Sequence, residues 1–543
     1  MASYTADVIV VGGGIAGITT ALELLDHDRN VLMLDRDEEA NFGGLAKESF
    51  GGLFFVNSRE QQRNGIKDSP TLALRDWHSF AEFGPDDRLP KLWAETYVER
   101  CIPDVYEWLR AGGIRFLPLP AWVERGEARP GNSVPRFHIV WGTGRELATR
   151  LIAALRAHPN RARFAIKFGH RVERLITQAG RVAGCAGTHE EDGTPFEARA
   201  EHVVIASGGI NGDIPRVKAN WHRDWGKPPD VILNGSHKYA DGTLHDAAAA
   251  LGGRLTHLDN MWNYASGVHH YRPRKPHHGL SLVPAKSALW LNWRGERISP
   301  PLVSGFDTRA LVTAICAQER QYSWQLLNRR IALKELAVSG AEFNPSIRDK
   351  SWLRFARDII LGNRWLVDEL TANCGDFVVA RSLPELVDKM NALQGDRSVD
   401  LAVLKDAVTR YDAEVARGAE ARDAQLRRIA ELRQYRGDRV RISKSQAILD
   451  ERAMPLIAIR EFIVSRKSLG GIATDLQCRV QAGEDRAIPG LYAVGEATGF
   501  GGGGMHGLRG LEGTFLGGSI LTGRMAGRSI GRDSLAPAGR GMG

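Results

Sequence analysis

The most informative segment of this chain lies near its start and reads Asp7-Val-Ile-Val-Val-Gly-Gly-Gly-Ile-Ala-Gly17. The apolar run 8–11 predicts a short buried strand, and the glycines follow it at once. Residues 18–25 have the spacing of a helix with one apolar face, and Val31-Leu-Met-Leu34 predicts a second strand that ends at Asp35. Together these parts form the βαβ unit that holds the ADP half of a dinucleotide.

Each residue of this unit has a physical task. A glycine at 12 allows the tight turn, one at 14 lets the backbone approach the pyrophosphate, and one at 17 lets helix and strand pack closely. The helix N-terminus offers free N–H groups and a partial positive charge to the phosphates. The alternative is a glycine-rich turn without a ligand. The candidate cofactor contacts in this segment are Gly12, Gly14, Ile15, Ala16, Gly17, Asp35 and Arg36.

Length and composition indicate a large globular protein. The 543 residues suffice for roughly two or three domains, and the content of 43% hydrophobic and 25% charged residues is ordinary. The net charge of +8 comes from dispersed Lys and Arg, which favours a solvated surface over a nucleic-acid site. Many of the 60 glycines are clustered, which indicates backbone packed against a large ligand.

The five cysteines are scattered, without a CxxC pair or the spacing of a metal site. They fit free thiols in a reducing compartment. No signal peptide precedes the first strand, and no apolar run approaches the roughly 20 residues of a membrane span. We therefore expect a cytoplasmic protein without a metal.

The amino-acid composition and the expected secondary structure change twice along the chain. Residues 1–254 and 447–532 are rich in glycine and short strands, including an expected β-meander over 163–206. Residues 255–446 are richer in Trp, Pro and Arg, and long helical patterns such as 400–435 occur there. This predicts an α/β Rossmann-like domain in two parts, interrupted by an inserted α+β cap. The Gly/Pro/Ser-rich residues 533–543 predict a flexible tail.

No second nucleotide-binding βαβ unit is evident. Ala206-Ser-Gly-Gly-Ile-Asn-Gly212 lacks the required spacing. If the first site holds a flavin nucleotide, its electrons have to come from or go to another molecule.

Five segments in order resemble the flavoprotein superfamily of fumarate reductase, succinate dehydrogenase and 3-ketosteroid dehydrogenases. They are the N-terminal motif, the Gly43-Gly44…Gly51-Gly52 loop, the strand Val203–Gly209, Leu469-Gly-Gly-Ile-Ala-Thr-Asp475, and Ile488–Glu496 with Gly504-Met-His-Gly507. The resemblance implies FAD, a cap over the flavin, and hydride exchange between flavin N5 and a carbon–carbon bond beside a carbonyl or carboxylate. It adds as cofactor contacts Gly43, Gly44, Leu45, Gly51, Gly52, Ala206, Ser207, Gly208, Gly495, Glu496, Gly513, Thr514 and Phe515.

In detail the chain is similar to a ketosteroid-dehydrogenase-like branch, and it departs from better-known members. The first Gly-rich loop reads Leu45-Ala-Lys-Glu-Ser49, without the His of covalent-flavin members, so FAD is expected to be non-covalent. Fumarate reductases carry a carboxylate-binding His where this chain has Arg466 and Lys467. The catalytic Tyr of 3-ketosteroid 1-dehydrogenases falls near Ile457.

Dehydrogenation needs a hydride acceptor, a base, and a donor that stabilises the enolate oxygen. Candidate donors are Arg466 and Lys467, which alternatively point to solvent. Tyr264 is a candidate proton donor or acceptor, or a core aromatic. His506 could contact the substrate or be a structural histidine of its loop. Arg136 and His138 match an Arg-x-His element near the family's substrate cavity, or belong to a surface strand.

The expected function is dehydrogenation, or reversible reduction, of a carbon–carbon bond beside the carbonyl of a lipophilic cyclic ketone, steroids included. The alternatives are an ene-reductase of an unsaturated acid, a flavin monooxygenase, and a non-catalytic FAD-binding protein. The expected partners are a small-molecule substrate and an external electron acceptor or donor, without nucleic acid. The oligomeric state stays open.

Overall fold

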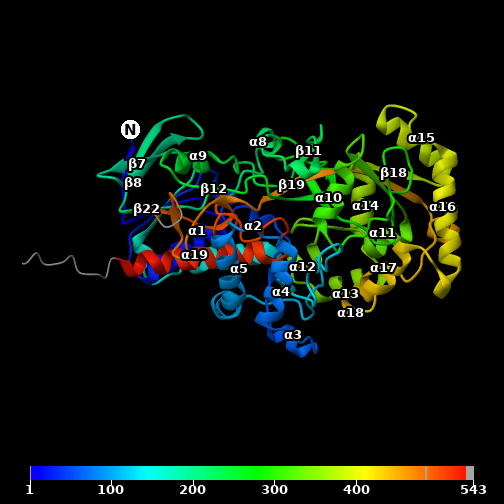
Figure 1. Cartoon of the computed structure of the whole chain (residues 1–543), viewed down its shortest axis with the longest axis horizontal. Helices are drawn as coiled ribbons and strands as arrows, with labels where there is room; N and C mark the ends of the chain where they lie inside the picture. Colours follow the sequence, from blue (N-terminus) through cyan, green and yellow to red (C-terminus); the bar gives the residue numbers. More distant parts are fainter. Residues whose placement is uncertain (1, 484–485, 534–543) are drawn as a thin grey trace, which may run out of the picture.

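The computed structural model describes residues 2–483 and 486–533. Figure 1 shows an elongated molecule, with β7, β8 and α19 in one half and helices α14–α18 in the other. Residues 534–543 of the expected tail lie outside the described residues.

A six-stranded sheet forms the centre of the first half. Its order is β21(Arg479–Gln481), β22(Ala487–Ala493), β10(His202–Ile205), β2(Val8–Val11), β3(Val31–Leu34) and β6(Phe164–Lys167). All neighbours are parallel except β21, which is antiparallel to β22. Every residue of β2 and β3 is buried, because one face of the sheet packs against helices and the other packs largely against a second sheet. The predicted βαβ unit is confirmed: α1(Ile15–Asp26) joins β2 to β3, and the long C-terminal helix α19(Thr514–Asp533) packs against α1.

A second, four-stranded sheet has the order β1(Ala2–Thr5), β9(Pro195–Arg199), β8(Arg181–His189) and β7(His170–Gln178). The expected meander is therefore confirmed for β7, β8 and β9. It was wrong for the strand near 162–166, which is β6 and pairs with β3 at the edge of the main sheet. Hydrophobic spacing predicts a strand, but only tertiary pairing chooses its sheet.

The second half is built on β19(Leu456–Ser468), a long strand buried over most of its length. The sheet runs β15(Leu289–Leu291), β16(Tyr322–Asn328), β19, β13(Met261–His269), β14(Gly279–Val283) and β17(Ala337–Val338), while β11(Ile232–Asn234) and β18(Phe377–Ala380) also pair with β19. This sheet thus takes strands from both sides of the expected 255–446 insertion. Those domain limits stay a prediction. A two-stranded ladder of β12(Leu255–Thr256) and β20(Gly471–Ile472) lies near the junction.

The remaining helices surround these sheets. Those before the cap are α2(Leu45–Glu48), α3(Arg59–Arg63), α4(Pro70–Ala81), α5(Arg88–Arg100), a π-helical turn (Cys101–Tyr106), α6(Glu107–Ala111), α7(Thr143–Arg156), α8(Ile214–Ala219) and α9(Thr243–Ala250), with the β4(Gly52–Phe54)–β5(Phe137–Ile139) pair among them. Those of the cap are α10(Thr308–Cys316), α11(Arg329–Glu335), α12(Pro345–Arg348), α13(Trp352–Leu361), α14(Arg364–Asn373), α15(Leu383–Gln394), α16(Leu401–Ala416), α17(Ala424–Leu432) and α18(Arg436–Arg441). The helical pattern 400–435 is thus two helices.

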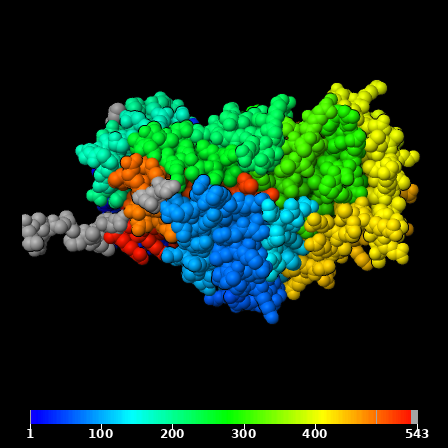
Figure 2. Space-filling view, in the orientation of Figure 1, coloured from blue at the N-terminus to red at the C-terminus, as the bar shows by residue number. Residues whose placement is uncertain are grey.

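The two halves cover the inner part of the C-terminal segment. In Figure 2 only a few orange-red atoms show between the blue N-terminal helices and the green residues that lead into the cap. Within residues 2–483 and 486–533, no helix is long and apolar enough to cross a membrane, and no group of three or more His, Cys, Asp or Glu could hold a metal ion.

Candidate functional site

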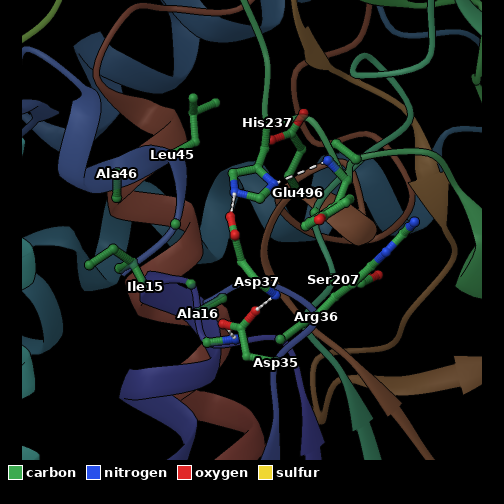
Figure 3. Close-up of a pocket in the computed structure, with 18 of the residues that line it drawn as sticks. Ile15, Ala16, Asp35, Arg36, Asp37, Leu45, Ala46, Ser207, His237 and Glu496 are labelled. Atoms are coloured by element: carbon green, nitrogen blue, oxygen red, sulfur yellow. Dashed lines mark hydrogen bonds and ion pairs between the residues drawn. The ribbon is translucent and has the colours of Figure 1, made fainter. Parts of the chain in front are cut away.

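A long pocket lies at the carboxyl ends of β2, β3 and β10. The glycine turn after β2, the loop 41–49, residues 206–208 after β10, the segment 237–244 and the first turns of α19 line it. Figure 3 shows Asp35, Asp37 and His237 one above another, with Ile15, Ala16, Leu45 and Ala46 opposite. The carboxyl edge of a parallel sheet is where such folds bind ligands.

Two glycines show why this turn fits a dinucleotide. Gly12 has φ +114°, and a Cβ there would lie 2.3 Å from the carbonyl oxygen of Ala206. Gly14 differs, because a Cβ there would meet nothing within 4 Å and φ is an ordinary −73°. The protein itself therefore leaves open space beside Gly14, at the N-terminus of α1. That space, with free backbone N–H groups facing it, fits a diphosphate.

Asp35 lines the pocket beside the glycine turn. One carboxylate oxygen accepts the Gly13 N–H at 2.9 Å, and the other accepts the Asp37 N–H at 2.9 Å. Burial raises the pKa of this carboxyl. The backbone thus holds Asp35 in place beside the glycine turn, where its remaining lone pairs can accept ribose hydroxyls.

Arg36 and Asp37 extend this end of the pocket. The Arg36 guanidinium pairs with Glu190 at 2.8 Å and with Asp241 at 2.6 Å, so its charge is already compensated. Asp37 pairs with His237 at 3.2 Å and Lys238 at 3.0 Å. Burial opposes ionisation of Asp37, but its hydrogen bonds to His237 and Asn41 outweigh that effect and lower the pKa.

The structure brings most of the predicted cofactor contacts together in one pocket. Those that line it are Gly12, Gly14, Ile15, Ala16, Asp35, Arg36, Gly43, Gly44, Leu45, Ala206, Ser207, Gly208, Glu496 and Phe515. The others are not lining residues and stay predictions: Gly17 and Gly495, which lie against Gly12 and Ala16 of the lining, and Gly51, Gly52, Gly513 and Thr514.

Sequence reasoning did not propose two stretches that line the pocket. They are 170–172 at the start of β7 and 237–244 before α9. The Asp241-Gly-Thr turn before an Ala-rich helix was visible in the sequence, but a turn of this kind carries no signal for a ligand on its own.

Lys467 connects the pocket to three side chains that are not among its lining residues, Tyr264, Glu512 and Trp262. Lys467 itself lines the pocket, and its ammonium lies 4.3 Å from the centre of the Phe515 ring and 3.4 Å from the Tyr264 hydroxyl. That hydroxyl donates to the Glu512 carboxylate, which also accepts the Trp262 indole N–H at 2.8 Å. These residues come from β13, β19 and the loop before α19, so only the tertiary fold brings them together.

The ionisation of these groups follows from their surroundings. Burial, opposed by Glu512 and assisted by Arg466, lowers the pKa of Lys467 to about 8. Burial and the Glu512 charge raise the pKa of Tyr264 well above its ordinary value. Burial also raises the pKa of Glu496, which lines the pocket and accepts the Ser468 N–H at 3.0 Å. Lys467 and Tyr264 thus pair an ammonium with a neutral phenol.

Arg466, the neighbour of Lys467, also lines the pocket but extends the other way. Its guanidinium donates to the carbonyl of Gly235 at 2.6 Å, and its Nε is buried without a partner among the described residues. The successive side chains of β19 thus serve two different surroundings.

His506 lies behind the lining. It is fully buried, stacks on Trp77, and shares a 2.7 Å hydrogen bond with the Thr514 hydroxyl. Burial and the nearby Lys467 lower its pKa to about 3, so it stays neutral. Its ring packs against Phe500 and Phe515, which do line the pocket. His506 therefore packs behind the aromatic side chains that line the pocket, and its expected contact with the substrate stays a prediction.

Arg136 and His138 lie away from the pocket lining. The Arg136 guanidinium is fully buried and pairs with Asp68 at 2.8 Å and Asp76 at 2.7 Å. His138 shares a 2.6 Å hydrogen bond with Ser58, and burial lowers its pKa to about 4. Nothing in these contacts supports the expected catalytic role. The β4–β5 pair is neither exposed nor part of the cavity, because a buried ion cluster holds it to the N-terminal helices.

The tryptophans considered for a substrate cavity, Trp262, Trp290, Trp293 and Trp324, are all buried. Trp324 belongs to the core of the cap and Trp290 to a cluster with α10. Core packing accounts for these two, while Trp262 contributes its indole N–H to Glu512.

Comparison with known proteins agrees with this geometry. The family described as "FAD binding domain" matches residues 7–516. A "KsdD-like steroid dehydrogenase" of Mycobacterium tuberculosis is 43% identical over 548 residues, covering 97% of this chain and 96% of that protein.

Two solved structures share the fold. A 3-ketosteroid-Δ4-(5α)-dehydrogenase from Rhodococcus jostii, in complex with 4-androstene-3,17-dione, has a TM-score of 0.65 at 19% identity and covers 97% of both chains. An open flavocytochrome c3 fumarate reductase has a TM-score of 0.69 at 20% identity, covering 98% of this chain and 79% of that one. The chain belongs to the FAD-binding domain family, and its cofactor is FAD.

Proposed function

We propose that this FAD-dependent oxidoreductase removes a hydrogen pair from a carbon–carbon bond beside the carbonyl of a lipophilic cyclic ketone of the steroid type, or adds it in reverse. The observation that carries the proposal is the Lys467–Tyr264–Glu512 group, in which Lys467 lines the FAD pocket and contacts the Tyr264 hydroxyl behind it. The steroid dehydrogenase named above, at 43% identity over nearly the whole chain, supports the substrate type.

The reaction divides into three tasks. The ketone loses a hydride from one carbon and a proton from the neighbouring carbon, and a carbon–carbon double bond forms. Bound FAD supplies the two-electron acceptor for the hydride. The protein then has to stabilise the enolate oxygen and receive the proton.

Lys467 is the donor for the enolate oxygen. Its ammonium is half-buried at the pocket wall, where the low dielectric strengthens a charge-assisted hydrogen bond. Among the described residues it forms no ion pair within 4.0 Å, so the charge is available to a substrate. Its pKa of about 8 keeps it mostly charged at neutral pH.

Tyr264 and Glu512 form the route for the proton. The phenol already donates to the carboxylate, so it can pass its proton to Glu512 while it accepts one from the substrate carbon. A tyrosine with a raised pKa does not ionise alone, and a hydrogen-bonded carboxylate is therefore needed for this step. Trp262 holds Glu512 in place at 2.8 Å.

Further parts of the proposal concern the cofactor and its partners. FAD is held without a covalent bond, because loop 45–49 offers no histidine. Electrons pass to or from an external partner. All five cysteines are unpaired and buried, which supports a reducing, cytoplasmic environment.

An anaerobic titration tests the reaction. The FAD-loaded protein is mixed with 3-ketosteroids and simpler cyclic ketones, and the visible band of the oxidised flavin is followed. We expect one ketone to bleach the band, and Tyr264→Phe to slow the bleaching while it keeps FAD bound. If no ketone bleaches the flavin but an unsaturated acid reoxidises the dithionite-reduced protein, the enzyme is an acid reductase instead. If neither happens, the catalytic proposal is wrong.

A further inference from the structure

A second cavity, of about 390 Å³, opens beside the FAD pocket between loop 40–49, Arg466 and the cap segments 274–281 and 339–343. We call it the basic hollow. The two cavities adjoin, because their linings share seven residues: Asp37, Asn41, Gly44, Leu45, Ser49, His237 and Arg466. Its volume is in the range of small-molecule clefts.

The charge of the hollow is strongly positive. Seven Lys or Arg residues line it against three Asp or Glu. Three of the seven are compensated: Lys238 pairs with Asp37 at 3.0 Å, Arg274 with Glu342 at 3.1 Å, and Arg348 with Asp349 at 2.7 Å. A surface that merely needed solubility would not concentrate one sign of charge in a concave site.

The other four cations are Lys47, Arg145, Lys275 and Arg466. Among residues 2–483 and 486–533, none of them forms an ion pair within 4.0 Å. Lys47 and Arg466 donate only to carbonyls, each at 2.6 Å, and Lys275 donates to the carbonyl of Ser236. The buried Arg466 Nε has no acceptor at all among these residues. Four cations that form no ion pair among these residues line one cavity, where Glu48 is the carboxylate that acts on Lys275, and this excess of positive charge makes a site for an anion.

The electrostatic surroundings of Lys275 support this assignment. Burial, opposed by the Glu48 charge and assisted by Arg466 and Arg274, lowers the pKa of Lys275 to about 8. A half-buried ammonium held beside other cations gains from any anion that replaces lost water. Arg145 stands at the exposed rim, where it adds attraction without needing burial.

We propose that the basic hollow binds the anionic group of the substrate, so that the ketone carries a carboxylate or phosphate on its side chain. This inference rests on the proposed function, because Arg466 joins the hollow to the pocket end where Lys467 meets the ketone. The lipophilic ring would lie at Lys467, and the charged tail at Lys275 and Arg145.

The test compares matched ligands on the FAD-loaded protein. The probes are neutral 4-androstene-3,17-dione, the carboxylate 3-oxochol-4-en-24-oic acid, and the 21-phosphate of a 3-ketosteroid. Affinity is read from the change in the oxidised flavin spectrum. We expect at least one anionic probe to bind about tenfold or more tightly than the dione, and added salt to remove this advantage. The two anionic probes show which group the site takes.

The variants are Arg145→Met and Arg145→Met with Lys275→Met, since both residues line the hollow but not the FAD pocket. Arg272→Met, an exposed cap residue near Lys275, is the control. We expect the single variant to weaken the anionic probe about threefold, and the double variant to bring it to the affinity of the dione. The dione, the FAD content and the control should not change. Because Arg145 is exposed, we expect the single variant to fold, so it measures the contribution of Arg145 to anion binding even if the double variant folds poorly.

The outcomes separate this inference from the proposed function. Equal affinity for anionic and neutral probes in the natural protein overturns the inference, and flavin bleaching by the dione would still support dehydrogenation. Loss of FAD from the Arg145 variant also overturns it, because the hollow would then serve the cofactor. Tight anion binding with no bleaching by any ketone supports the hollow and contradicts the proposed reaction.

Discussion

The two ends of the FAD pocket are built in different ways. The end at Gly12, Gly14 and Asp35 is backbone geometry from one continuous stretch of chain. The end at Lys467 gathers side chains from β13, β19 and the loop before α19, more than 200 residues apart along the chain for Tyr264 and Lys467. A local motif can specify where a cofactor binds. The chemistry performed there depends on charges that distant segments bring together.

The largest expected effect tests whether Arg136 belongs to the catalytic end. Arg136→Met leaves Asp68 and Asp76 buried without their cation, and should lower the free energy of unfolding by about 3–5 kcal/mol. Chemical denaturation measures this, with the exposed Arg129→Met as control. The bleaching rate per folded, FAD-loaded molecule should stay unchanged. A stable variant with abolished turnover would instead place Arg136 among the catalytic groups.

Gly14→Val sharpens the description of the nucleotide end. The protein leaves room for the side chain, and φ is ordinary, so the apoprotein should keep its melting temperature. The valine would occupy the space of the diphosphate, and FAD affinity should fall about a hundredfold or more, or at least 2.7 kcal/mol. Fluorescence titration with FAD measures the loss. Gly375→Val, also in open space, is the control. Unchanged FAD binding would move the cofactor away from this turn.

Lys467→Met probes the catalytic end without touching the glycine turn. Removing a hydrogen bond from a charged donor costs about 2 kcal/mol, so flavin bleaching should slow about thirtyfold with FAD still bound. Lys467→Arg should recover part of the rate, because a guanidinium can also hold an enolate oxygen. Stopped-flow absorbance gives these rates. Equal rates for the methionine variant and the natural protein would exclude Lys467 as the donor.

The smallest expected effect is a pH dependence at the same residue. Lys467 has to be charged to hold the enolate, and its pKa is lowered from 10.5 to about 8. Activity should therefore be present below pH 8 and fall as pH rises through that value, by up to about tenfold per unit in kcat/KM. In Lys467→Arg this alkaline fall should move to higher pH. An alkaline limb that is identical in both proteins would assign it to another group.

Sequence patterns were sufficient for the nucleotide end because its information is local. Strand, glycine turn, helix and terminal acid occupy residues 8–35, and steric rules for glycine apply before any tertiary contact forms. The fold class was confirmed, and most of the predicted FAD contacts line one pocket, where their role stays a prediction. The strand at 164–167 was assigned to the meander, since its apolar alternation does not state which sheet it joins.

The catalytic end shows the opposite limit. Tyr264, Arg466 and Lys467 were predicted one by one, but the role of Glu512 as the shared acceptor of Tyr264 and Trp262 depended on packing between β13 and the loop before α19. Arg136 and His138 were predicted near the substrate. In the structure both are buried away from the pocket lining, where Arg136 pairs with Asp76 and His138 hydrogen-bonds to Ser58. Type and spacing of residues do not reveal whether a charge is compensated.

By itself the sequence determined a βαβ dinucleotide site, an interrupted α/β architecture and the resemblance to FAD-dependent oxidoreductases, because these depend on short-range spacing and backbone sterics. Only the tertiary structure decided which cations stay free. Within the described part of the chain, it paired Arg36, Arg136 and Arg274 with carboxylates and left Lys275 and Lys467 without an ion pair within 4.0 Å. The electrostatic energy of a charged group depends on its distance from other charges and on its burial, and residue order alone does not specify either quantity.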